Sequence, residues 1–300
     1  MKLDFLKKIS NKIFQVAIDG PSVSGKSSMA KEVAKHFKFN HINSGLIYRS
    51  ISYETMLRCD LTFLKSPKFD QGIVKQIIQN ANIDIISNKK KSSKPLNNPT
   101  VEEIKESYNK FLDELKKMNV NIDKDQKIYN NGEDVTETLL KESIGLATSL
   151  LASIQEVRNR VNEIQIFYIN ESSQNGIVID GRDISYNVLP NAEVKLFITA
   201  SIEERAKRSL RRSKENTTDE NISETVQKIA QRDHSDITRK HGPLKKTNDA
   251  IVVDTTELNY EESIKKTIEI VSKIYKNYNL KSEIERNKVE NKFLKFDFKK

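Results

Sequence analysis

The chain has 300 residues, of which 36% are hydrophobic and 31% are charged, and its formal net charge is +9. That length allows one large domain or two ordinary ones, with an unusually polar surface. The single cysteine, Cys59, excludes an internal disulfide framework and a thiolate metal cluster. No apolar run approaches the roughly 18 residues of a membrane span, and the N-terminus lacks a signal-peptide core. These features predict a cytoplasmic protein without a membrane partner.

The predicted elements begin with a short basic extension, residues 1–13, and a buried strand over Phe14–Ile18. Gly20–Ser27 follows and reads GPSVSGKS, which fits the phosphate-binding pattern G-x-x-x-x-G-K-[ST]. Apolar residues at helical spacing from Met29 to Phe37 predict a helix directly after this loop. The strand, the loop and the helix therefore stand in the order that a P-loop requires.

A P-loop binds a nucleoside triphosphate through inward-facing backbone N–H groups and the positive end of the following helix. We expect Lys26 to reach the terminal phosphates and the Ser27 hydroxyl to bind Mg²⁺. A GTPase would also carry an Asn-Lys-x-Asp segment, and Lys245–Asp249 has those letters in the wrong order. The sequence therefore favours another class of P-loop protein.

Strands and helices continue in alternation along the chain. We expect a strand over 39–43 with a helix from 44, a helix over 143–168, strands over 176–180 and 193–198, helices from 201 and over 224–240, a strand over 250–255 and a helix over 260–275. Between them lies an excursion over 61–135, with an irregular loop over 87–99, a helical pattern over 104–115 and a strand with an Asn-Gly turn over 127–135. The order predicts an α/β fold, a P-loop NTPase-type parallel sheet flanked by helices.

Arg49 and Arg182 stand just after the second and third predicted strands, and Arg232 and Arg239 follow further along the chain. The carboxyl ends of parallel strands meet at one edge of a sheet, where ligands bind. Arginine grips phosphate through a planar pair of N–H groups. Because the loop around Lys26 already serves one phosphorylated ligand, these arginines predict a second one.

Five segments in order resemble one known family. They are Ala17–Ser28, Asn43–Arg49 (NSGLIYR), Ile179–Ala192 with DGRDI, Thr199–Ala206, and Arg232–Ala250 with Arg239 and PLKK. Together they are similar to the bacterial-type cytidylate kinases, members of the nucleoside monophosphate kinases, over roughly residues 14–58 and 132–272. Asn43 departs from the family's usual Asp.

That resemblance implies transfer of the γ-phosphoryl group of ATP to CMP or dCMP, with Mg²⁺ as cofactor. It implies ATP binding by Gly20, Pro21, Ser22, Val23, Ser24, Gly25, Lys26, Ser27 and Ser28, with Ser27 on the metal. It implies monophosphate binding by Ser44, Arg49, Ser149, Arg158, Arg182, Asp183, Arg232, Asp236 and Arg239. Lys26, Arg182 and Arg239 would be catalytic. Asp183, Asp236 and the serines would read the cytosine and the sugar by hydrogen bonds, with an aspartate as the acceptor for the exocyclic amine. Arg205 and Arg208 are candidates for contact with the transferred group.

The resemblance also implies a domain plan. We expect a kinase domain over 14–275, with a core over 14–60 and 143–275, a monophosphate-binding insert over 61–142 that holds a Lys- and Asn-rich loop over 87–125, and a helical lid near 205–235. A basic tail, 276–300, follows. We expect a monomer with no specific nucleic-acid partner. Two alternatives stay open: a kinase for UMP or another small anion such as shikimate, and a nucleic-acid-binding protein with a vestigial P-loop.

Overall fold

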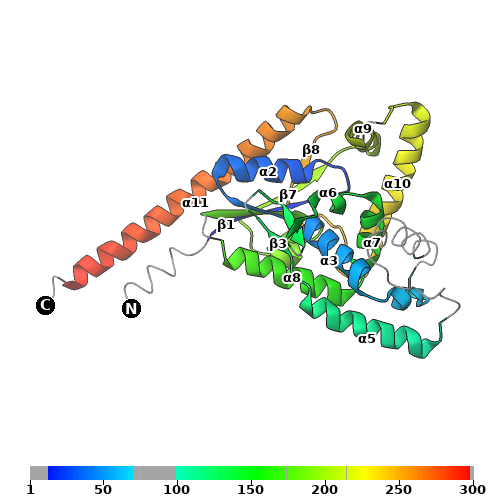
Figure 1. The fold of residues 1–300 in the computed structure, drawn as a ribbon. Coiled ribbons are helices and arrows are strands. Elements are labelled where there is room, and N and C mark those ends of the chain that lie inside the picture. Colours follow the sequence, from blue (N-terminus) through cyan, green and yellow to red (C-terminus); the bar gives the residue numbers. More distant parts are fainter. Residues whose placement is uncertain are drawn as a thin grey trace. The chain divides into compact units, whose positions relative to one another are not determined.

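The computed structural model describes residues 13–69, 74, 99–123, 125–130, 132–172, 175–213 and 215–297, with side chains up to Ile284 (Figure 1). Most of the expected extension 1–13 and of the expected loop 87–99 lies outside the described residues. The chain forms two compact units. Unit 1 comprises the described parts of 1–41, 172–230 and 244–300, and unit 2 comprises those of 42–171 and 231–243.

A five-stranded sheet with the order β2-β6-β1-β7-β8 carries the α/β fold. Its strands are β2 (Asn40–Asn43), β6 (Gly176–Gly181), β1 (Phe14–Asp19), β7 (Val194–Thr199) and β8 (Ile251–Asp254). β1 pairs in parallel with β6 and with β7, and β7 pairs in parallel with β8. The predicted parallel sheet flanked by helices is confirmed. Since β1 is the central strand, the loop that follows it opens at the middle of the sheet's carboxyl edge.

Two helices pack against the sheet of unit 1 and lie side by side, α2 (Lys26–Phe37) and α11 (Tyr260–Asp297). Phe14, Val16 and Ile18 of β1 are fully buried in a core with Val33 of α2 and Val271 of α11. Burial of each such side chain contributes about 1.5–3 kcal/mol relative to exposure. This packing fixes the direction in which β1 enters the loop.

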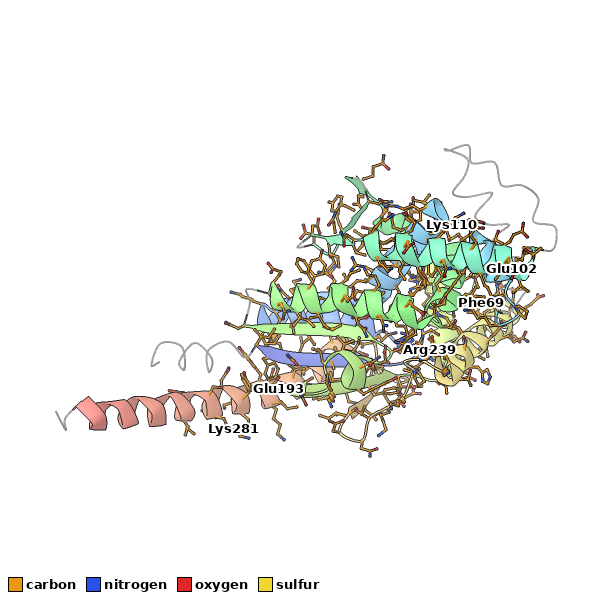
Figure 2. All side chains as sticks on the ribbon, turned by 90° about the horizontal axis from the view of Figure 1, so that it is seen from below. Phe69, Glu102, Lys110, Glu193, Arg239 and Lys281 are labelled. Atoms are coloured by element: carbon orange, nitrogen blue, oxygen red, sulfur yellow. The ribbon has the colours of Figure 1, made fainter. Side chains whose placement is uncertain are left out.

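Unit 2 is mainly helical. Among its described residues the helices are α3 (Ser44–Arg58), η1 (Leu61–Lys65), α5 (Val101–Lys117), α6 (Thr136–Leu139), α7 (Glu142–Leu151) and α8 (Gln155–Asn170). A small antiparallel sheet joins β3 (Asn121–Ile122), β4 (Ile128–Asn130) and β5 (Glu133–Asp134). Phe63 and Phe111 stack with ring centroids 4.5 Å apart, which joins η1 to α5. Glu102 and Lys110 of α5 are exposed, and Figure 2 labels both.

The remaining helices are η4 (Ile184–Val188), α9 (Ile202–Ser213) and α10 (Asp219–Thr238). None of the helices in the described part of the chain has both the length and the apolar character needed to cross a membrane.

Three expected element boundaries were wrong. The single helix expected over 143–168 is two helices, because the chain leaves helical geometry at Ile154, which has φ −85° and ψ 124°. The helical pattern expected over 104–115 is confirmed as α5, which the Thr100 capping box and the buried Phe111 and Leu115 stabilise, so the Lys- and Asn-rich loop expected over 87–125 does not extend through that range. The last helix continues from Tyr260 to Asp297 instead of ending at Tyr275.

Candidate active site

The loop between β1 and α2 has the backbone geometry of a phosphate cradle. Gly25 lies at φ +88° and caps α2, whose first turn carries no acidic residue. A Cβ on Gly20 would lie 2.1 Å from the carbonyl oxygen of Ile198, so only glycine fits there. Val23 also has a left-handed backbone, with φ +56°. These turns present N–H groups and a positive helix end to the centre of the loop.

Two polar side chains inside the loop fit a triphosphate. Lys26 is buried, and its Nζ donates to the carbonyl oxygen of Pro21 at 3.0 Å, which holds the ammonium group against the loop. The buried Ser24 Oγ has no hydrogen-bond partner among the described residues. An unpaired buried hydroxyl costs free energy, and a phosphate oxygen would satisfy it. The residues present therefore fit the group that the sequence predicts.

Ser27 makes a contact that the sequence alone did not predict. Its Oγ lies 2.5 Å from Oδ2 of Asp180, the last residue but one of β6. β6 is the parallel neighbour of β1, with Ile18 opposite Asp180. A serine hydroxyl beside a carboxylate is an all-oxygen donor set that suits Mg²⁺. The signal in the sequence is the three consecutive apolar residues 177–179 followed by Asp180, a pattern that indicates a buried strand with an acidic residue at its carboxyl end.

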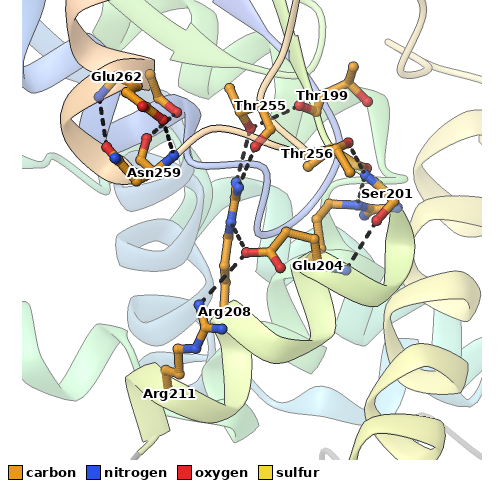
Figure 3. Close-up of polar contacts among 12 residues, drawn as sticks. Thr199, Ser201, Glu204, Arg208, Arg211, Thr255, Thr256, Asn259 and Glu262 are labelled. Carbon is orange, nitrogen blue, oxygen red and sulfur yellow. Dashed lines mark hydrogen bonds and ion pairs between the residues drawn. The ribbon is translucent and has the colours of Figure 1, made fainter.

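Arg205 and Arg208 of α9 contact unit 1 itself. Arg205 is buried and donates to the carbonyl oxygens of Ala200 at 3.1 Å and Ser22 at 3.0 Å, so it stabilises the loop at Ser22. Arg208 pairs with Glu204 at 3.0 Å and donates to Oγ1 and the carbonyl oxygen of Thr255 at 3.0 and 2.6 Å (Figure 3). In this arrangement both guanidinium groups are held by protein oxygens beside the loop.

Asp183 follows β6 in unit 1, in a segment that is tied to the start of the loop. The carboxylate of Asp19 accepts from the backbone N–H groups of Ile184 and Ser185, both at 2.8 Å. Burial raises the pKa of Asp19, against the lowering effect of these hydrogen bonds. Asp183 is itself buried and accepts from Asn187 Nδ2 at 2.8 Å. Its neighbour Arg182 is half-buried, with NH1 3.4 Å from the Gly181 carbonyl.

The other expected substrate residues lie in unit 2. Ser44 is buried and begins α3, while the side chain of Asn43 caps that helix by accepting from the Leu46 N–H at 3.1 Å. Asn43 can therefore perform the capping role of an Asp without its charge. Arg49 donates to the carbonyl oxygens of Leu139 at 2.5 Å and Lys141 at 3.2 Å, which join α6 to α7.

Arg158 and Arg239 converge on one turn of unit 2. Arg158 is 1% exposed, and a Cβ on Gly242 would lie 2.0 Å from its NH2. Arg239 donates from Nε to the Gly242 carbonyl oxygen at 2.7 Å and from NH1 to Asp236 at 3.1 Å. Tyr48 lies under the Arg158 guanidinium, with the ring centroid 5.4 Å from Cζ. Figure 2 labels Arg239 just beyond the end of α10. The turn thus holds two cations and one carboxylate together.

Ser149 and Arg232 complete the expected set in unit 2. Ser149 is half-buried on α7, and Arg232 is exposed on α10. The expected ATP residues, Arg182 and Asp183 therefore belong to unit 1, and the remaining monophosphate residues belong to unit 2.

Known proteins resemble this chain along most of its length. The family model described as Cytidylate kinase matches residues 16–273. A protein named cytidylate kinase from Caldicellulosiruptor bescii is 33% identical over 272 residues, 91% of this chain and 99% of that protein. One from Bacillus subtilis is 33% identical over 261 residues, 87% and 97% of the two chains. One from Mycoplasmopsis synoviae is 31% identical over 258 residues, 85% and 97%.

Proposed function

Because this chain belongs to the cytidylate kinase family, we propose that it transfers the γ-phosphoryl group of ATP to CMP or dCMP. The protein is a cytidylate kinase, an ATP-dependent phosphotransferase. The acceptor nucleotides, the use of Mg²⁺ and the role of each residue are our proposal. A monomeric, cytoplasmic enzyme without a nucleic-acid partner also stays a prediction.

The loop of unit 1 binds the donor. Its backbone N–H groups, Lys26 and the unpaired Ser24 hydroxyl surround the triphosphate oxygens. Ser27 and Asp180 would hold Mg²⁺. A metal bound there would supply positive charge that neutralises the charge developing on the phosphate oxygens. Arg205 keeps the loop in shape by holding the Ser22 carbonyl.

The arginines and aspartates bind the acceptor. Arg49, Arg158, Arg182 and Arg239 neutralise the monophosphate, whose oxygen is the nucleophile. This oxygen is already anionic, so the reaction needs positioning and charge neutralisation more than a general base. It attacks the γ-phosphorus, the bond to the β-bridging oxygen breaks, and the electron pair leaves with ADP. Asp183 and Asp236 accept hydrogen bonds from the nucleoside.

Arg158 and Arg239 meet at the Gly242 turn, and Arg239 pairs with Asp236; this arrangement is the observation that carries the choice of acceptor. Two arginines match a phosphate, and a carboxylate beside them matches an exocyclic amine. A shikimate site has no amine to be read, so this turn favours a cytosine nucleotide. The retained polar groups of the loop also argue against a vestigial P-loop.

A coupled assay across CMP, dCMP, UMP, AMP and GMP tests this proposal. We expect turnover with CMP and dCMP to exceed that with UMP. In the Asp236→Asn variant the ratio of kcat/KM for CMP over UMP should fall about 10- to 100-fold, because a carboxylate pairs better than an amide with the cytosine amine. Asp233→Asn, also buried on α10, is the control and should leave the ratio unchanged. Turnover of AMP without turnover of cytidine nucleotides would refute the proposal.

A further inference from the structure

Asp180 is contacted from two sides within unit 1. On one side its Oδ2 lies 2.5 Å from Ser27 Oγ, and on the other its Oδ1 lies 2.8 Å from Nε2 of His41. The strand order explains this arrangement, since β6 lies between β1, which leads to Ser27, and β2, which carries His41. The residues form a row, His41–Asp180–Ser27, assembled from three separate parts of the chain.

The chemistry of the row defines which group donates. The Asp180 carboxylate accepts hydrogen bonds, so His41 must present a proton on Nε2 to bind it. The other ring nitrogen, Nδ1, is buried and has no hydrogen-bond partner among the described residues. Asp180 is therefore the polar partner that orients the His41 ring. The side chains of His41 and Asp180 are 9% and 2% exposed, so water competes little for this contact.

The same reasoning applies at the other end of the row. When Ser27 donates its hydroxyl proton to Oδ2, the lone pairs of Oγ are turned away from Asp180 and are free to meet a cation. The carboxylate torsion of an aspartate is broad, so a single partner does not define it. With a donor on each oxygen, the carboxylate plane has one orientation.

We propose that His41 is a positioning residue for the metal–nucleotide site: it holds Asp180, and through Asp180 it sets the orientation of the Ser27 hydroxyl. This inference rests on the proposed role of Ser27 and Asp180 at Mg²⁺. Outer partners of metal-site groups typically change metal affinity or activity by about 10- to 100-fold. Since Mg²⁺ is held largely by phosphate and water oxygens, we expect an effect near the lower end.

The test is the binding of ATP to the full-length protein without CMP, measured by calorimetry with Mn²⁺ and again with EDTA. His41→Leu should weaken binding of Mn²⁺–ATP about tenfold and change binding of metal-free ATP less than twofold. His41→Gln should bind like the wild type, because its amide nitrogen can occupy the place of Nε2. His41→Asn is the matched control: its amide is too short to reach Asp180, and it should bind like the leucine variant.

A double-mutant cycle distinguishes action through Asp180 from a general packing effect. In an Asp180→Asn background, His41→Leu should weaken Mn²⁺–ATP binding by less than twofold further. Three results would each overturn the proposal. The first is an equal loss of ATP affinity in His41→Leu with and without metal, and the second is a His41→Gln variant that binds Mn²⁺–ATP as weakly as His41→Leu. The third is a double mutant whose loss of affinity is the full sum of the two single losses. Phosphoryl transfer to CMP by the wild type, measured on the same preparation, reports separately on the proposed function.

A measurement on the wild type keeps the proposal testable if the leucine variant does not fold. A long-range proton–nitrogen NMR spectrum of the imidazole groups, assigned by comparison with His41→Gln, identifies the protonated nitrogen of His41. We expect a proton on Nε2. A neutral ring protonated only on Nδ1 could not donate to Asp180, and that result would overturn the proposal.

Discussion

Val23 is a β-branched residue in the phosphate loop with a left-handed backbone, φ +56°. Glycine adopts this conformation without a steric penalty, whereas a Cβ approaches its own backbone. We therefore predict that Val23→Gly is more stable than Val23→Ala. The comparison of these two variants is informative because both remove the two γ-methyl groups of Val23 and differ only in the Cβ.

The magnitude follows from two opposing terms. A Cβ in the left-handed region costs about 1–2 kcal/mol. Glycine loses more chain entropy on folding than alanine, which costs about 0.4–1 kcal/mol. The difference leaves about 0.5–1 kcal/mol in favour of Val23→Gly. In a chain of this size we expect the thermal midpoint of Val23→Gly to be about 1–2 °C above that of Val23→Ala.

Thermal unfolding followed by circular dichroism compares the two variants directly, with two further pairs as controls. Lys38, the exposed C-cap of α2, has φ +55°, so Lys38→Gly should also be more stable than Lys38→Ala. Lys35 is exposed in the last turn of the same helix. At this helical position Lys35→Ala should be more stable than Lys35→Gly by about 1 kcal/mol. If Val23→Ala proves as stable as Val23→Gly while the two control pairs behave as stated, the backbone of the loop is not strained at this residue.

Three further predictions concern Gly242, Ser24 and Asp19. Gly242→Ala should raise the KM for CMP about tenfold without raising the KM for ATP, because φ +56° disfavours alanine and the added Cβ would meet Arg158. Steady-state kinetics with each substrate varied in turn would show this difference, and equal changes in both KM values would contradict it. Ser24→Ala should not destabilise the free protein, because the lost hydroxyl has no partner among the described residues. The same variant should raise the KM for ATP about tenfold. A lower thermal unfolding midpoint together with an unchanged KM for ATP would contradict this prediction. The raised pKa of Asp19 means that the folded state binds this proton more tightly than the unfolded state does. The free energy of unfolding of the wild type, relative to that of Asp19→Asn, should therefore decrease as pH rises from 3.8 through the folded-state pKa. Denaturant titrations at several pH values measure this difference, and a difference that stays constant or increases with pH would contradict the prediction.

The sequence by itself determined the local features of this protein. The strand Phe14–Asp19, the loop GPSVSGKS and the helix after it are adjacent in the chain, and their spacing predicted the phosphate cradle. The alternation of strands and helices also predicted the parallel sheet. Both signals are short-range, because a strand repeats every two residues and a helix about every 3.6. Ordered motifs then supplied the family resemblance.

Only the tertiary structure decided which distant side chains meet. Ser27 and Asp180 are separated by 153 positions, and His41 and Asp180 by 139. Their contacts depend on the strand order β2-β6-β1, which no local pattern encodes because strands that are neighbours in a sheet can be far apart in the chain. The helix break at Ile154, which lets Arg158 donate to the Ala152 carbonyl, and the pairing of Arg158 with the Gly242 turn were equally hidden. The loop around Lys26 could therefore be identified from its letters alone, whereas the residues that orient its serine required the folded sheet.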